Sequence, residues 1–425
     1  MHPPRRGGTT FRSLREHRNY RLYFGGQIVS YSGTYVQDTA LPWLVLQLTQ
    51  SPFQVGLLVL CRFAPFTLLG LFTGALADRV DNRRLLIVTQ TISMAVAASL
   101  AALVFTGTAR PVVVFALAAI SGTAAAFDSP ARQSLTYELV GRDELPNAIA
   151  LNASFLNTGR VVGPALGGVF IAAFGIGWCF VLNAGSFVAV LAGLLLMRSA
   201  ELVRRDKSAE AEAGAVRLIG EAFRYLRGSV ELQLIMVMGA VFGLFGFTAL
   251  RTLLSVVASR TLHRGAETFG VLFASYGAGA LAGALLIATL GRATWRGLFA
   301  GALGYSVAML VLAPTHLVAL AVALVFVEGV CWAVWSSQAQ TLVQLAAPDR
   351  LRGRAVGLCT YGVTAAAPLG GLLAGWLAGV GGTFLALTTC GAAGLTATSI
   401  AAIVRRRALS APLPTEPALA VSVID

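Results

Sequence analysis

The sequence Gly74-Ala-Leu-Ala-Asp78-Arg79-Val-Asp-Asn-Arg83-Arg84 is a short charged stretch between two long apolar runs, 55–76 and 85–104. Apolar runs of about 20 residues joined by so short a connection indicate two membrane-spanning helices and a tight turn. The three arginines place this turn on the cytoplasmic side, because short loops rich in arginine remain there. Asp78 and the aspartate at 81 precede the second run, where carboxylates cap free N–H groups and favour the helix dipole. The sequence therefore predicts a capped cytoplasmic turn.

The composition identifies the class of protein. The chain has 425 residues, of which 56% are hydrophobic and 12% are charged, and its mean hydropathy is +0.74. A soluble protein of this length needs more polar residues to cover its surface. The five cysteines are scattered among apolar runs without metal-site spacing, which favours buried thiols and predicts no disulfide framework, metal or cofactor. We expect a polytopic protein embedded in the lipid bilayer.

The basic residues are divided unequally between the two sides of the membrane. Of the 32 Lys and Arg residues, 26 fall in segments on one side, three on the other and three inside helices. This is the positive-inside pattern, and it accounts for the net charge of +13 without a nucleic acid partner. We expect a protein of the plasma (inner) membrane with both termini in the cytoplasm.

Twelve membrane helices are expected from the apolar runs, which makes the fold an all-α membrane protein. Their ranges are 22–46, 54–76, 85–106, 111–128, 147–173, 177–197, 231–257, 268–290, 295–313, 317–340, 355–379 and 383–404. The domain boundaries that follow are a cytoplasmic segment 1–21, a six-helix half 22–197, a cytoplasmic linker 198–230, a second half 231–404 and a tail 405–425. Within the linker, apolar residues at helical spacing in 216–226 indicate a helix lying on the membrane surface.

The two halves repeat short sequences in the same order. Gln133-Ser-Leu and Pro164-Ala-Leu-Gly-Gly in the first half recur as Gln340-Thr-Leu and Pro368-Leu-Gly-Gly in the second. An offset of about half the chain, with an even number of helices between the copies, indicates parallel repeats about an axis along the membrane normal. The sequence therefore predicts two pseudo-symmetric halves.

The fifth expected helix contains the run Gly159-Arg160-Val-Val-Gly163-Pro164-Ala-Leu-Gly167-Gly168. Pro164 removes a backbone donor and bends the helix, while the glycines allow other helices to approach closely. From these residues alone, a kinked packing helix and a functional motif both remain open.

Three features resemble the major facilitator superfamily. The turn at 74–84 is similar to its cytoplasmic gate signature, in which the aspartate meets a neighbouring helix end and the arginines bridge the halves, although an aspartate stands at 81 where the family usually has glycine. The run at 159–168 resembles the signature of its antiporting exporters, and the stretches 40–45, 127–133 and 183–187 resemble its enterobactin-exporter and drug-efflux branch. The resemblance implies two six-helix halves that meet through helices two, five, eight and eleven, and a central cavity lined by helices one, four, seven and ten.

Ionisable residues inside the membrane are costly and are candidates for function. Asp38 in the first helix and Arg62 in the second lie at similar depths and could form an ion pair, either structural or coupled to protons. Glu328 in the tenth helix is the first candidate for binding a proton or a cationic substrate. Arg160 is a candidate counter-ion for Glu328 or for an anionic substrate, and Arg251 is expected to extend toward the outer membrane surface.

The resemblance implies a secondary active exporter of a small amphiphilic molecule, such as a drug, a siderophore or a secondary metabolite. It would work by alternating access and proton antiport, as a monomer. A uniporter or importer is the alternative within the superfamily. A membrane enzyme or sensor is the alternative outside it, but the chain has no HExxH or GxSxG motif. The only lysine, Lys207, is not in a nucleotide-binding loop, so no nucleotide is expected.

Overall fold

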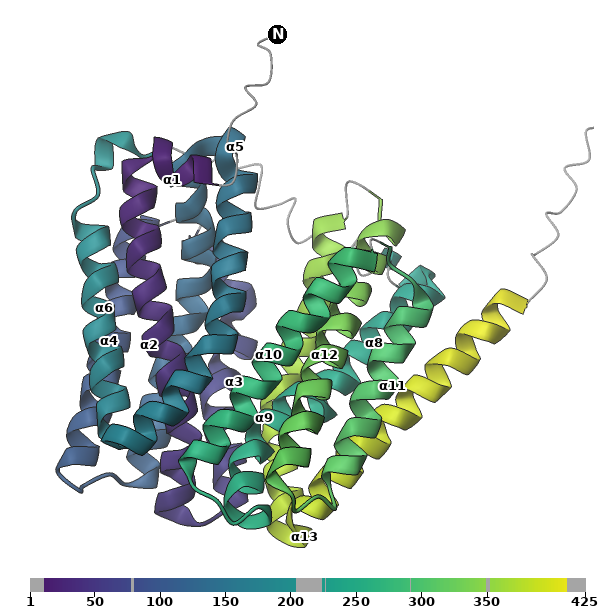
Figure 1. Ribbon diagram of the computed structural model, residues 1–425. Helices are drawn as coiled ribbons and strands as arrows, with labels where there is room; N and C mark the ends of the chain where they lie inside the picture. Colours follow the sequence, from purple (N-terminus) through teal and green to yellow (C-terminus); the bar gives the residue numbers. More distant parts are fainter. Residues whose placement is uncertain are drawn as a thin grey trace, which may run out of the picture.

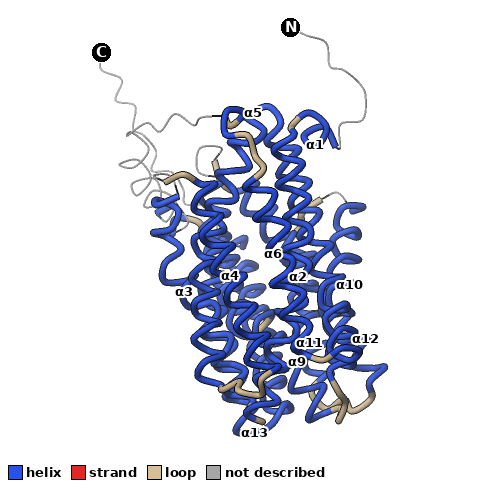
Figure 2. Tube along the Cα trace, turned by 90° about the vertical axis from the view of Figure 1, so that its left-hand side faces the viewer, coloured by secondary structure: helices blue, strands red, loops and turns tan. Residues whose placement is uncertain are grey.

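The structure, a computed structural model, describes residues 11–77, 80–203, 224–225, 227–290, 292–348 and 352–410. In this part of the chain every regular element is a helix (Figure 2). The first half contains α1 (Arg12–Glu16), α2 (Arg18–Thr49), α3 (Pro52–Ala77), α4 (Asn82–Phe105), α5 (Pro111–Phe174) and α6 (Ile176–Leu195), followed by the short η2 (Ser199–Glu201). The second half contains α8 (Val230–Phe245), α9 (Phe247–Val256), η3 (Val257–Thr261), α10 (Ala266–Leu290), α11 (Trp295–Leu312), α12 (Val318–Ala346) and α13 (Arg352–Ser410).

Two of these helices reverse direction and each supplies two spans. A straight helix of 64 residues, the length of α5, would be about 96 Å long, three times the thickness of a bilayer core. Instead, α5 breaks at Gly141, where φ is 70°, and α13 breaks at Gly382, where φ is 72°. Glycine adopts this left-handed conformation without a Cβ clash, so both reversals depend on it. Figure 1 shows the two reversals at opposite ends of the molecule.

The twelve-helix architecture predicted from the sequence is confirmed. Nine helices of the described residues are long and apolar enough to cross a membrane. Among these, α5 and α13 each contain two spans, and α8, α9 and η3 form one bent span. The remaining span is α2, whose hydropathy is lowered by buried polar residues such as Gln27 and Gln37. The described chain begins and ends at the same end of the molecule (Figure 1).

One predicted boundary was wrong. The fourth span was expected to end at 128, but the helix continues without interruption as far as Gly141. Beyond the expected end, Arg132 pairs inside the helix bundle with Asp128 one turn earlier, and Asp128 also accepts hydrogen bonds from α4. Smaller differences occur at the ends of the first and last spans: α2 begins at Arg18 where 22 was expected, and α13 continues to Ser410 where 404 was expected. Residues 204–223, most of the predicted linker and its surface helix, lie outside the described part of the chain.

The two halves meet along two pairs of helices. In the first half α2 packs on α5 and α6, and in the second half α10 packs on α12 and α8 packs on α13. Between the halves α3 packs on α13 and α5 packs on α10, which are the spans two, eleven, five and eight expected from the resemblance. Figure 1 shows the halves diverging toward the end that carries α1 and meeting toward the opposite end.

Candidate functional site

The helix that follows the predicted gate turn is capped at its start, as expected. Asp81 is the N-cap of α4, and its Oδ1 accepts a hydrogen bond from the backbone N–H of Arg84 at 3.1 Å. The backbone of Asp81 is extended, with φ −72°, so glycine is not required at this position. The Arg84 side chain is 87% exposed and lies 3.6 Å from the Asp81 carboxylate. This end of the motif is therefore a solvated helix cap.

Arg83 contacts the C-terminal end of the neighbouring helix α6. Its Nε donates to the carbonyl oxygen of Leu194 at 2.7 Å, and its Nη2 donates to that of Leu195 at 3.1 Å. These carbonyls belong to the last turn of α6, where a cation also interacts favourably with the helix dipole. The family resemblance implied arginines that bridge the halves, but Arg83 ties α4 to α6 within the first half. Asp78 and Arg79 lie outside the described residues, as do the surroundings of Gly74.

The predicted antiporter motif lies in the second arm of α5. Gly167 faces α2: a Cβ at this position would lie 2.9 Å from the Cβ of Thr39. This contact is within one half, so Gly167 brings two helices of the same half together. The side-chain environments of Gly159, Arg160, Gly163, Pro164 and Gly168 lie outside the part that the structure describes.

Asp38 and Arg62 lie together between three helices of the first half. Nη2 of Arg62 on α3 is 3.9 Å from Oδ1 of Asp38 on α2. Nη1 of Arg62 donates a hydrogen bond of 2.9 Å to Oγ of Ser121 on the first arm of α5. The two charged side chains are only 18% and 28% exposed. Arg62 is thus a membrane-embedded cation with one charged and one neutral partner.

Glu328 lies in the interior of the second half. The residue is fully buried, and neither of its carboxyl oxygens has a hydrogen-bond partner among the described residues. Its neighbour Gly329 packs against the backbone of Tyr276 on α10, and Tyr305 on α11 interacts electrostatically with the carboxyl. The carboxyl is therefore enclosed by its own half and is not exposed to the space between the halves.

Aromatic side chains form a continuous cluster beside Glu328. Trp332 stacks on Phe247 with ring centres 5.0 Å apart, and Trp335 stacks on Phe242 at 5.1 Å. Trp332 and Trp335 also contact each other at 5.2 Å. The guanidinium of Arg251 lies 5.3 Å from the Phe247 ring. The prediction that Arg251 extends toward the membrane surface was therefore wrong, because its cation packs on this aromatic cluster.

A second embedded ion pair was missed by the sequence analysis. Asp128 and Arg132, one turn apart on the first arm of α5, pair with each other. Asp128 Oδ1 also accepts hydrogen bonds from Thr89 at 3.0 Å and from Gln90 at 2.6 Å, both on α4. The Arg132 guanidinium lies 5.0 Å from the ring centre of Tyr31 on α2. The i,i+4 spacing of opposite charges was the available signal, but the expected span ended at Asp128 and left Arg132 outside it.

The comparisons with known proteins agree with this arrangement. A bacterial homologue of the lysosomal transporter Spinster, in an inward-facing and unoccupied conformation, has the same fold, with a TM-score of 0.67 and 17% identity over 92% of this chain and 96% of that one. The multidrug efflux pump Tap of Mycolicibacterium fortuitum is 29% identical over 84% of this chain and 89% of its own length. The enterobactin exporter EntS of Citrobacter koseri is 26% identical over 86% of each chain.

A family model described as transmembrane secretion effector matches residues 9–417, which is nearly the whole chain. This match includes the gate turn, the second arm of α5 and both embedded ion pairs. The chain therefore belongs to the transmembrane secretion effector family of the major facilitator superfamily.

Proposed function

We propose that this transporter exports a small amphiphilic molecule, of the drug, siderophore or secondary-metabolite type, in exchange for protons. It works by alternating access as a monomer in the plasma (inner) membrane, with both termini in the cytoplasm, and catalyses no covalent reaction. The names of two relatives, a multidrug efflux pump and an enterobactin exporter, support the direction and the substrate class. The excess of basic residues on one side of the membrane supports the orientation.

The observation that carries the proton coupling is the buried carboxyl of Glu328, which has no hydrogen-bond partner in the described part of the chain. Burial without a hydrogen-bond partner is tolerated far better by a neutral acid than by a carboxylate. Ionisation of Glu328 would therefore favour a conformation in which the carboxyl reaches water or a cation. Uptake and release of one proton would then bias the equilibrium between the two conformations of the transporter.

The contacts between the halves support an inward-facing conformation in the proposed orientation. They lie toward the end opposite α1, where Gly375 of α13 packs against the backbone of Pro52 and Gly56 of α3. At the same end, Trp43 of α2 stacks on Phe269 of α10 with ring centres 5.9 Å apart. Close backbone contacts made by glycine can separate without breaking side-chain interactions, which suits an interface that opens and closes.

The test is proton movement in everted membrane vesicles with an imposed pH gradient, challenged with a panel of amphiphilic dyes, drugs and siderophores. We expect at least one compound to release protons with the wild type and not with Glu328→Gln. Asp38→Asn tests the other embedded carboxyl in parallel. Glu201→Gln is the matched control, because this carboxylate is exposed and, among the described residues, pairs only with Arg198.

Two outcomes would contradict parts of this proposal. Release that survives Glu328→Gln would place the coupling at another residue. Transport of a compound without any proton movement would favour the uniporter or importer instead, and direct uptake into right-side-out vesicles would then show the direction.

A further inference from the structure

A long apolar groove follows the contact between α5 and α10. It has a volume of about 810 Å³. The side chains that line its apolar part come from three helices: Val169, Ala173, Val271, Ala274, Ala278 and Val322. Among the described lining residues Ser275 carries the one hydroxyl, and it donates a 2.6 Å hydrogen bond to the carbonyl oxygen of Val322. This hydroxyl is therefore already satisfied when an apolar ligand enters.

The groove opens toward the lipid. Val169 and Val271 are 63% and 51% exposed. On the opposite face of α10, Phe269 and Phe273 are buried and contact Trp43 and Arg251 inside the protein. Ala278 is twelve residues from the start of α10, a distance of about 18 Å along the helix. Because half of a bilayer core is about 15 Å thick, the groove spans the depth of one leaflet.

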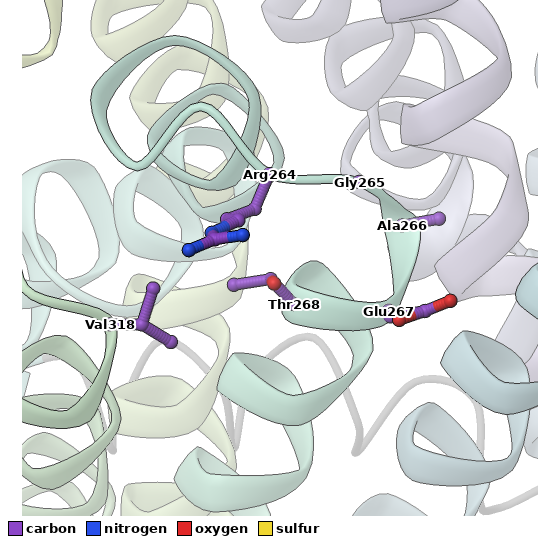
Figure 3. Close-up of a pocket in the computed structure, with 6 residues that line it drawn as sticks. All are labelled: Arg264, Gly265, Ala266, Glu267, Thr268 and Val318. Atoms are coloured by element: carbon purple, nitrogen blue, oxygen red, sulfur yellow. The ribbon is translucent and has the colours of Figure 1, made fainter.

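Two residues of opposite charge flank the first turn of α10, one in the wall of the groove and one in a hollow beside it. Glu267, in the first turn of α10, lines the groove and also an adjoining hollow that contains Arg264 and Thr268. Figure 3 shows Arg264 and Glu267 on opposite sides of this turn. Both residues are exposed, and neither makes an ion pair among the residues described. The site thus has an apolar channel of one-leaflet depth, with one cation and one anion at its aqueous end.

We propose that this groove binds one phospholipid with a phosphoethanolamine headgroup, taken from the leaflet on the side opposite the N-terminus. The headgroup ammonium lies against Glu267, the phosphate lies against Arg264, and one acyl chain follows Val271, Ala274 and Ala278. This charge arrangement selects a zwitterion, because an anionic headgroup would meet Glu267 without a compensating ammonium. A lipid held along the α5–α10 contact also stabilises the present arrangement of the halves, since the two helices cannot separate there without displacing it.

The test is native mass spectrometry of the purified full chain with phosphatidylethanolamine, phosphatidylcholine or phosphatidylglycerol of identical acyl chains. We expect one saturable phosphatidylethanolamine, bound at least fivefold more tightly than phosphatidylglycerol. Phosphatidylcholine should bind with intermediate affinity, because its ammonium is charged but lacks N–H donors. Glu267→Gln should weaken phosphatidylethanolamine binding at least threefold.

The groove itself is tested by filling it. Ala274→Trp and Ala278→Trp should each remove the saturable lipid, whereas Leu285→Trp should not, because Leu285 is a lipid-exposed residue of α10 at the other leaflet. Arg264→Gln should also weaken phosphatidylethanolamine binding, because the proposed site places the phosphate against Arg264. Arg110→Gln is its control and should leave binding unchanged, since Arg110 is also exposed and also precedes a helix on the same side.

Two outcomes would overturn the lipid site. One is a folded Ala274→Trp or Ala278→Trp variant that binds phosphatidylethanolamine as tightly as the wild type does. The other is equal binding of the three lipids that is insensitive to Glu267→Gln. Neither measurement depends on transport, so the lipid site and the proposed function can fail separately.

Discussion

The two halves of the molecule use the same helix contact for different chemistry. In the first half, Gly122 of α5 lies directly against the backbone carbonyl of Arg62 on α3. In the second half, Gly329 of α12 lies in the same way against the carbonyl of Tyr276 on α10. Gly122 and Gly329 are 207 residues apart, as are Gln133 and Gln340 of the sequence repeat. The repeat has therefore preserved a close backbone contact.

The side chains beside this contact have not been preserved. Next to Gly122 is Ser121, which accepts a hydrogen bond from Arg62, and Arg62 also has the carboxylate of Asp38 nearby. At the position equivalent to Ser121 the second half has Glu328, which is buried without a hydrogen-bond partner among the described residues. At this position one half thus holds a charge with two partners, and the other holds an ionisable group to which no described residue donates a hydrogen bond. Shared packing leaves each half free to have its own electrostatic role.

The largest effect is expected from the glycines that the halves share. Gly122→Ala and Gly329→Ala should each lower the free energy of unfolding by about 3 kcal/mol or more, because the new methyl group meets a backbone carbonyl that cannot rotate away. Thermal unfolding of the purified protein measures this. Gly185→Ala is the control, since nothing lies within 4 Å of a Cβ at that position. Equal midpoints for all three variants would show that the repeated contact does not constrain packing.

The next effect separates the two halves. Glu328→Gln should reduce proton-coupled transport at least tenfold with little change in the unfolding midpoint, because glutamine keeps the shape of the side chain and cannot release a proton. Ser121→Ala, at the equivalent position, should leave the transport rate within about twofold. Vesicle assays of both variants at matched expression check this. A comparable loss of transport in both variants would mean that transport is sensitive to any change at these equivalent positions, and not to the carboxyl of Glu328.

A smaller effect is expected from the ion pair of the first half. Arg62→Ala should lower the free energy of unfolding by about 1–2 kcal/mol, a value between those of exposed and buried pairs. Part of this loss should be recovered in the double variant with Asp38→Ala, because a lone embedded carboxylate is less favourable than none. A double-variant cycle of unfolding midpoints measures the recovery, and strictly additive losses would show that the two residues do not interact.

The smallest effect is expected from the hydrogen bond between Arg62 and Ser121. Ser121→Ala should lower the free energy of unfolding by about 1 kcal/mol, because the Arg62 guanidinium loses one hydrogen-bond acceptor but keeps the Asp38 carboxylate nearby. In the Arg62→Ala background the same substitution should have no measurable effect. An unchanged loss in that background would assign the effect to local packing of Ser121.

The sequence predicted the fold better than it predicted the site. Apolar run length and the placement of arginines were enough for the twelve spans, because a bilayer imposes one length on every helix. The same reasoning ended the fourth span at Asp128 and left Arg132 outside it, because a run of polar residues looks alike whether water or a neighbouring helix satisfies it. Arg83 was placed in the turn and expected to bridge the halves, but it lies in the first turn of α4 and binds α6. Arg251 was expected to extend to the membrane surface, but it packs on Phe247.

The sequence by itself determined the class of protein, the number of spans, the relation between the halves and the placement of Asp38, Arg62 and Glu328 inside the membrane. These features depend on the period, length and charge of local segments, because the bilayer constrains each membrane-spanning segment separately. Only the tertiary structure decided which charges have partners: Arg62 meets Asp38 and Ser121, whereas Glu328 is enclosed without a hydrogen-bond partner in the described chain. The physical reason is that satisfying a side chain depends on atoms brought from other helices, and helix packing alone sets their distances.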